Sequence, residues 1–145
     1  MNTSYENIVI VGDKMKFNEY NLTNSEGKSN CVIRSFCKMF NLTYDDVYNE
    51  LCNIQKELNA NSYNDIEVFE TFMNKRNVES IEYGKDIQIK NLKLDKGSYI
   101  VFCWDKDEFY HMVPIIDNII YDRDDRCMEL YVLNIYKQKE LVKNK

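Results

Sequence analysis

The chain of 145 residues has fewer basic than acidic residues, 19 against 24, and no long apolar run. Its formal net charge at pH 7 is −5, whereas nucleic-acid-binding domains carry a basic surface, so we expect no nucleic-acid partner. The longest apolar runs, such as residues 99–104, are too short to cross a bilayer, and residues 1–6 are polar rather than a secretory leader. The composition therefore predicts a cytoplasmic protein without a membrane partner.

Cysteines show no sign of pairing. The chain has five, an odd number, and none of them forms a Cys-x-x-Cys motif. Without an export signal, this usage favours free thiols in a reducing cytosol. A zinc site would need several of these scattered cysteines together with the single histidine, so we expect no metal and no other cofactor.

Composition and length indicate one folded domain. Hydrophobic residues make up 44% of the chain and aromatic residues 13%, values that are usual for a folded protein. A chain of 145 residues can bury one core but is too short for two domains, and it contains no repeat or linker. We therefore expect a single domain over residues 1–145, in which residues 137–145 form a frayed, lysine-rich tail.

Three amphipathic helices are predicted in the first half of the chain. The first begins at Cys31, after Ser29 and Asn30, which both suit an N-cap, and its apolar stripe lies at positions 33, 36, 37 and 40. The second follows Thr43, which opens a sequence similar to a capping box. A third begins near Asn64 and fades by residue 77.

Short strands are predicted in the second half. They cover residues 78–83, 87–89, 98–104, 109–116, 119–123 and 128–136, with a further short strand at 7–12 and an ambiguous segment at 14–20. Asp117-Asn118 fits a two-residue hairpin turn between apolar arms. The predicted class is α+β, with N-terminal helices packed on a C-terminal antiparallel meander.

The first predicted helix places Cys31 in its first turn. Free backbone N–H groups and the positive end of the helix dipole favour a thiolate at such a position. This pattern fits a nucleophile, although on its own it also fits a small, unreactive residue packed under a loop.

The only histidine, His111, lies on the predicted strand 109–116. If Asp117-Asn118 is a two-residue turn, the numbers of cross-strand partners add to 235, which places His111 opposite Asp124. Asp122 then lies on the same face, diagonal to the imidazole. A carboxylate in either position can orient the ring and stabilise its protonated form. The pattern does not choose between the two aspartates, and it also fits an exposed histidine beside solvated carboxylates.

Two segments carry a resemblance to a known family. Residues 30–35 read Asn-Cys-Val-Ile-Arg-Ser, and residues 111–122 read His-Met-Val-Pro-Ile-Ile-Asp-Asn-Ile-Ile-Tyr-Asp. They resemble the motifs Asp-Cys-Val-x-Arg-Ala and His-x-Val-x-x-x-Asp-Gly-x-x-Tyr-Asp of the papain-like cysteine peptidase superfamily. The nearest likeness is to its bacteriocin-processing-peptidase-like group and related small phage and bacterial proteins.

The resemblance implies a papain-like fold and a cysteine hydrolase, a peptidase or amidase that acts on a protein or peptide. It implies Cys31 as the nucleophile, His111 as general base and acid, and Asp122, at the Tyr-Asp position, as the residue that orients His111. Two positions depart from the family pattern. Ser25 stands where the family has its oxyanion-hole glutamine, for which Asn24 or Asn30 could substitute, and Pro114 removes an N–H from the histidine strand.

The missing glutamine leaves a second function open. A papain-fold module without turnover could bind a protein instead, for example as a phage-encoded inhibitor of a host protein. An acyltransferase on the same three residues would differ only in the group that resolves the thioester.

Overall fold

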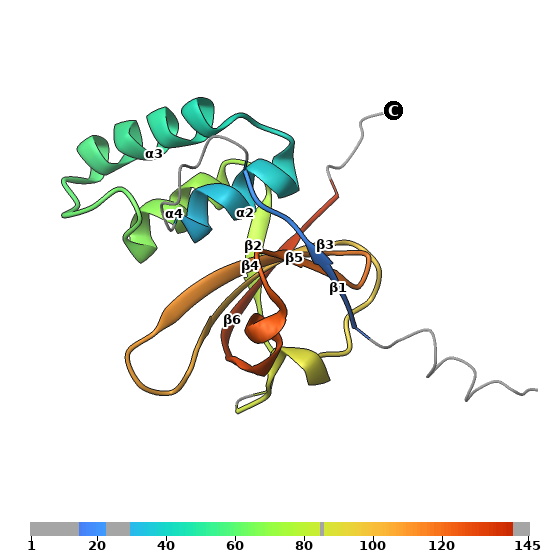
Figure 1. The fold of residues 1–145 in the computed structure, drawn as a ribbon. Helices are drawn as coiled ribbons and strands as arrows, with labels where there is room; N and C mark the ends of the chain where they lie inside the picture. The colour runs from blue at the N-terminus through green and yellow to red at the C-terminus, as the bar shows by residue number, and fades with distance from the viewer. Residues whose placement is uncertain (1–14, 23–29, 85, 141–145) are drawn as a thin grey trace, which may run out of the picture.

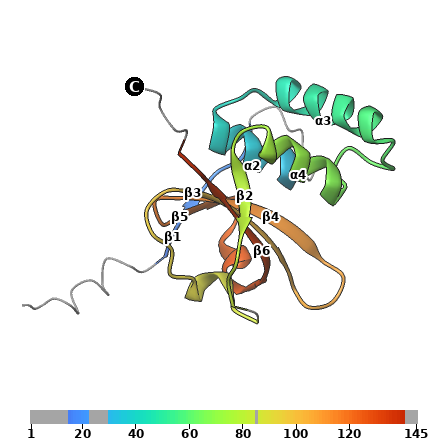
Figure 2. The same cartoon turned by 180° about the vertical axis from the view of Figure 1, so that it is seen from behind.

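The computed structural model describes residues 15–22, 30–84 and 86–140. Its helices are α2 (Cys31–Phe40), α3 (Tyr44–Leu58) and α4 (Ile66–Asn74), with short 3₁₀ helices η1 (Ile89–Asn91) and η2 (Asp125–Glu129). Its strands are β1 (Lys16–Glu19), β2 (Val78–Ile81), β3 (Ser98–Trp104), β4 (Tyr110–Ile116), β5 (Ile119–Asp122) and β6 (Tyr131–Gln138). The three α-helices group on one side of the sheet in both views (Figures 1 and 2). The α+β class is therefore confirmed.

The sheet is mixed, and the predicted antiparallel meander is wrong. Its strand order is β1-β5-β4-β3-β6-β2, with β1 parallel to β5 and the other neighbours antiparallel. After β5 the chain passes through η2 and returns along the far side of β3, so β6 pairs with β3 rather than with β5. The ambiguous segment near the N-terminus supplies β1. The hydrophobic periodicity of the sequence predicts strands, but it does not show which strands are neighbours in the sheet.

Several boundaries also differ from the prediction. The apolar segment 87–89 leads into η1 and makes only one isolated bridge, Gln88 with Tyr131. The last strand begins at residue 131 rather than 128, because η2 occupies the residues before it. Lys137 and Gln138 belong to β6 and pair with β2, so the predicted tail cannot begin at residue 137. The predicted strand at 7–12 lies outside the described residues.

The helix starts follow local capping chemistry. Helix α2 begins at Cys31, as predicted, although the side chain of Asn30 makes no capping bond. Helix α3 begins after Thr43, whose hydroxyl accepts a hydrogen bond from the Asp46 N–H at 3.1 Å, as the capping box predicts. Helix α4 begins at Ile66, slightly later than expected.

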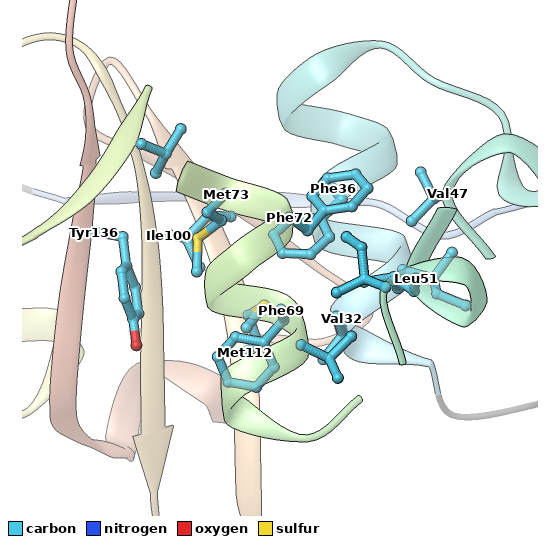
Figure 3. Packing of buried hydrophobic residues seen from close by; sticks show 14 of the residues in the cluster. Val32, Phe36, Val47, Leu51, Phe69, Phe72, Met73, Ile100, Met112 and Tyr136 are labelled. Atoms are coloured by element: carbon cyan, nitrogen blue, oxygen red, sulfur yellow. The ribbon is translucent and has the colours of Figure 1, made fainter. Parts of the chain in front are cut away.

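Buried side chains form a cluster on each face of the sheet. The cluster under the helices contains Phe36 of α2 stacked on Phe72 of α4, with ring centroids 4.4 Å apart (Figure 3). Alternation along β3 sends Ile100 to this cluster and Val101 to the cluster on the other face. Because the apolar stripe of α2 anchors this helix against the sheet, its N-terminus is held next to β4.

Candidate active site

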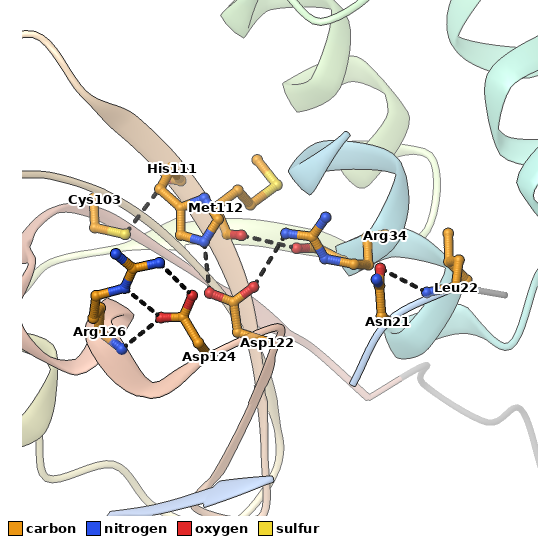
Figure 4. A network of polar contacts seen from close by, with 10 residues as sticks. Asn21, Leu22, Arg34, Cys103, His111, Met112, Asp122, Asp124 and Arg126 are labelled. Atoms are coloured by element: carbon orange, nitrogen blue, oxygen red, sulfur yellow. Dashed lines mark hydrogen bonds and ion pairs between the residues drawn. The ribbon is translucent and has the colours of Figure 1, made fainter. Parts of the chain in front are cut away.

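Three elements bring the predicted catalytic residues together. Cys31 is the first residue of α2, His111 is the second residue of β4, and Asp122 is the last residue of β5. His111 Nε2 lies 2.6 Å from Asp122 Oδ2 (Figure 4), and the Cys31 thiol lies near enough to the imidazole for each group to shift the pKa of the other. Since Nε2 is engaged by the carboxylate, Nδ1 is the ring nitrogen left for the sulfur.

The β4–β5 hairpin positions Asp122. Asp117 and Asn118 both have positive φ, as a two-residue type I′ turn requires, and the numbers of the cross-strand pairs Ile116 with Ile119 and Ile115 with Ile120 add to 235 as predicted. The ladder ends after these two pairs, next to Pro114, which has no N–H to donate. From there β5 continues along β1.

The side chain of Asp117 serves the turn, because its Oδ1 accepts a hydrogen bond from the Gly97 N–H at 3.0 Å.

The structure separates the two candidate aspartates. Asp124 caps η2 and accepts hydrogen bonds from the Arg126 N–H at 2.9 Å and from its guanidinium at 3.1 and 2.9 Å. The expected pairing of His111 with Asp124 is wrong, because β5 ends at Asp122 and the hairpin register does not extend that far. Asp122 is the buried carboxylate in contact with the imidazole.

A second cation contacts the Asp122 carboxylate. Arg34, which lies one turn after Cys31 on α2, donates from Nη2 to Asp122 Oδ1 at 3.1 Å. The next residue, Ser35, donates from Oγ to the Met112 carbonyl at 3.2 Å and so ties α2 to β4. Sequence reasoning left the partner of Arg34 open, because Asp122 lies 88 residues further along the chain.

Electrostatics favour a thiolate–imidazolium pair. Burial raises the pKa of Cys31, but the hydrogen bond and charge of His111, the Met112 N–H and the charge of Arg34 together hold it below its ordinary value. Burial lowers the pKa of His111, but the bonds and charges of Asp122 and Cys31 outweigh it and raise this pKa to about 9. Burial raises the pKa of Asp122, whereas His111, the Arg123 N–H and Arg34 lower it to below its usual range.

No family model, curated protein or solved structure matches this chain. The resemblance of the two motifs therefore stays a prediction, and the chemistry must be argued from the site itself. Within residues 15–22, 30–84 and 86–140, no group of three or more His, Cys, Asp or Glu could hold a metal ion. No helix in these ranges is long and apolar enough to cross a membrane.

The other cysteines have different surroundings. Burial raises the pKa of Cys37 to about 11 and that of Cys103 well above its ordinary value, and it also raises the pKa of Cys127. The Cys103 thiol donates to the His111 carbonyl at 3.4 Å, within the cluster on the far face of the sheet. Cys52 lies half-buried on α3. Cys31 differs from Cys37, Cys103 and Cys127 in that its neighbours lower its pKa.

Next to the nucleophile, the side chain of Asn30 is held in one orientation. Its Nδ2 donates to the Tyr44 hydroxyl at 3.0 Å, and its Oδ1 accepts from the Tyr63 hydroxyl at 2.7 Å. This use of the amide by two tyrosines was not visible in the sequence pattern. Asn24, the other candidate donor, and Ser25, at the position of the family glutamine, lie outside the described residues.

A recess of about 430 Å³ opens beside His111 and Asp122. Phe109 forms part of its wall, half exposed and stacked on the imidazole with centroids 5.5 Å apart. Arg123 contributes a cation, and Leu130 an apolar side chain. His111 and Asp122 line the recess, whereas Cys31 does not.

Proposed function

We propose that this chain is a papain-like cysteine hydrolase, a peptidase or amidase that cleaves a protein or peptide through a thioester on Cys31. The observation that carries the proposal is a cysteine at a helix N-terminus, beside an imidazole that a buried carboxylate holds through Nε2. The free thiols suit a reducing, cytoplasmic setting.

The proposed reaction begins with Cys31 as thiolate and His111 as imidazolium. The sulfur attacks the scissile carbonyl carbon, and the carbonyl oxygen becomes an oxyanion, for which the N–H groups at the start of α2, which have no partner within the helix, are suitable donors. His111 then gives its proton to the amine nitrogen, the C–N bond breaks, and a thioester remains. A water molecule that loses a proton to His111 attacks the thioester and releases the acid and the thiolate.

Asp122 has two tasks in this scheme. Its bond to Nε2 keeps Nδ1 directed toward the sulfur, and its negative charge stabilises the imidazolium before the proton is transferred. Ionised Asp122 itself keeps its charge throughout, because its pKa is lowered.

The recess is the proposed site for the leaving-group side of the substrate. The amine must lie within reach of His111, and whatever is bonded to that amine continues beyond the imidazole, away from Cys31. His111 lines the recess, with Phe109 as an aromatic wall and Arg123 as a cation.

Asn30 is the proposed side-chain donor to the oxyanion in place of the family glutamine. Tyr44 takes one hydrogen of its Nδ2, which leaves the second hydrogen for a substrate oxygen beside Cys31. Removing one oxyanion donor typically slows an enzyme by about 10²–10³-fold. Asn30→Ala should therefore slow turnover by a factor in this range while leaving Cys31 reactive toward small alkylating agents.

Alkylation with iodoacetamide, followed by mass spectrometry of each cysteine, tests the proposal. Cys31 should react at least about ten times faster than the other four cysteines near neutral pH, and His111→Ala should abolish this preference. The denatured protein, in which all five cysteines should react alike, is the control. Equal labelling in the folded protein would instead favour a binding module without turnover, such as an inhibitor of a host protein.

A further inference from the structure

Arg34 is a buried charge that the proposed reaction does not use. Its side chain is 3% exposed, and its Nη2 bonds one oxygen of Asp122 while His111 bonds the other (Figure 4). The carboxylate is therefore held between two cations, one from α2 and one from β4. A single hydrogen bond to His111 would leave it free to rotate about its side-chain bonds.

The four groups alternate in charge. In the reactive state, Cys31 is negative, His111 positive, Asp122 negative and Arg34 positive, and the first and last of these lie one turn apart on the same helix. The buried set is then neutral as a whole. Without Arg34 it would carry one uncompensated negative charge, which a buried environment disfavours.

Four other titratable groups near this set are uncharged at neutral pH. They are the hydroxyls of Tyr20 and Tyr63 and the thiols of Cys103 and Cys127, and burial raises the pKa of each. Lys38, further along α2, lies over the rings of Tyr20 and Tyr121. On the recess side, Arg126 is paired with Asp124, and Arg123 faces the open recess. On the helix side, Arg34 is the cation that contacts Asp122 directly.

We propose that Arg34 is a positioning residue of this site, which fixes the Asp122 carboxylate against His111 and by its charge favours the thiolate of Cys31. This inference rests on the proposed function and concerns how the ion pair is set, not which bond is cleaved.

The charge of Arg34 predicts the direction in which the pKa values of Cys31 and His111 shift when it is removed. Removing a cation makes the thiolate less stable, so the pKa of Cys31 rises, and it makes the imidazolium more stable, so the pKa of His111 rises as well. Both shifts go the same way. For charges separated by about one helical turn in a partly buried site, each shift should be on the order of one pH unit.

The experiment measures the rate of Cys31 alkylation by iodoacetamide across pH, together with the NMR titration of His111. In Arg34→Gln, the midpoint of the alkylation curve and the titration of His111 should both move up by about one pH unit. Below the midpoint, alkylation should then be about tenfold slower than in the wild type. Arg34→Lys keeps the charge, so its alkylation midpoint should lie close to that of the wild type.

Arg76→Gln is the matched control. Arg76 also forms a half-buried ion pair, with Glu50 at 2.8 and 2.6 Å, and packs over the Phe72 ring, away from the four groups of the site. It should lower stability without moving the midpoint. If Arg34→Gln also lowers stability but leaves the midpoint and the His111 titration unchanged, Arg34 is only structural and the inference is overturned.

A second pair of variants covers the case in which Arg34→Gln does not fold. Asp122→Asn is compared with the double variant Arg34→Gln/Asp122→Asn, in which two amides replace the ion pair. The double variant should have the higher midpoint, and equal midpoints would overturn the inference. The proposed function is tested separately, by whether Cys31 in the wild type is alkylated faster than the other cysteines. The role of Arg34 is tested only by differences between variants.

Discussion

Asp122→Asn should remove most of the stabilisation of the His111 imidazolium. The carboxylate lies 2.6 Å from Nε2 in a buried site, and the pKa of His111 is raised from 6.5 to about 9. At about 1.4 kcal/mol per pKa unit, this rise corresponds to roughly 3 kcal/mol in favour of the charged ring. Burial opposes this rise, so Asp122 and Cys31 together supply more than the net amount. In the variant, Arg34 also loses its counter-ion and repels the imidazolium.

We therefore expect the pKa of His111 to fall by about two units or more in Asp122→Asn. The assay is a pH titration followed by NMR, and it needs no assignment strategy because His111 is the only histidine in the chain. Asp124→Asn is the control, since that carboxylate bonds Arg126 at the surface and should leave His111 unchanged. A His111 pKa that stays near 9 without Asp122, or that falls as far without Asp124, would refute the reasoning.

Three further predictions concern stability and reactivity. Phe36→Ala should cost about 3–5 kcal/mol of unfolding free energy in denaturant titration, because the ring is fully buried and stacked on Phe72, and a loss below about 1 kcal/mol would contradict this packing. Thr43→Ala should cost about 1 kcal/mol, because the Asp46 N–H loses its cap, whereas Thr43→Ser should be nearly neutral. Cys103 should resist alkylation until the protein unfolds, because it is buried with a raised pKa; rapid labelling in the folded state would contradict its placement.

The parts of the fold that depend on local chemistry were predictable. The start of α2 at Cys31 follows from the apolar stripe behind it, and the start of α3 follows from the Thr43 cap. The β4–β5 register follows from the two-residue turn at Asp117-Asn118, whose geometry allows one pairing. These features depend on residues a few positions apart, which a sequence pattern records directly.

The parts that depend on distant pairing were not predictable. The passage of β6 to the far side of β3 and the parallel pairing of β1 with β5 depend on long-range contacts that hydrophobic period does not encode. The contact of Arg34 with Asp122 joins residues 88 positions apart. The prediction that Asp124 lies opposite His111 assumed that the pairing of β4 with β5 continues to that position. The alternation of polar and apolar residues does not show that the ladder ends near Pro114.

The ultraviolet absorbance of the thiolate, measured across pH as wild type minus Cys31→Ala, tests the central claim most directly. A thiolate–imidazolium pair predicts a step of one thiolate that appears below the ordinary thiol pKa and disappears in His111→Ala. A difference spectrum in which Cys31 ionises only at or above the ordinary thiol pKa would contradict the account.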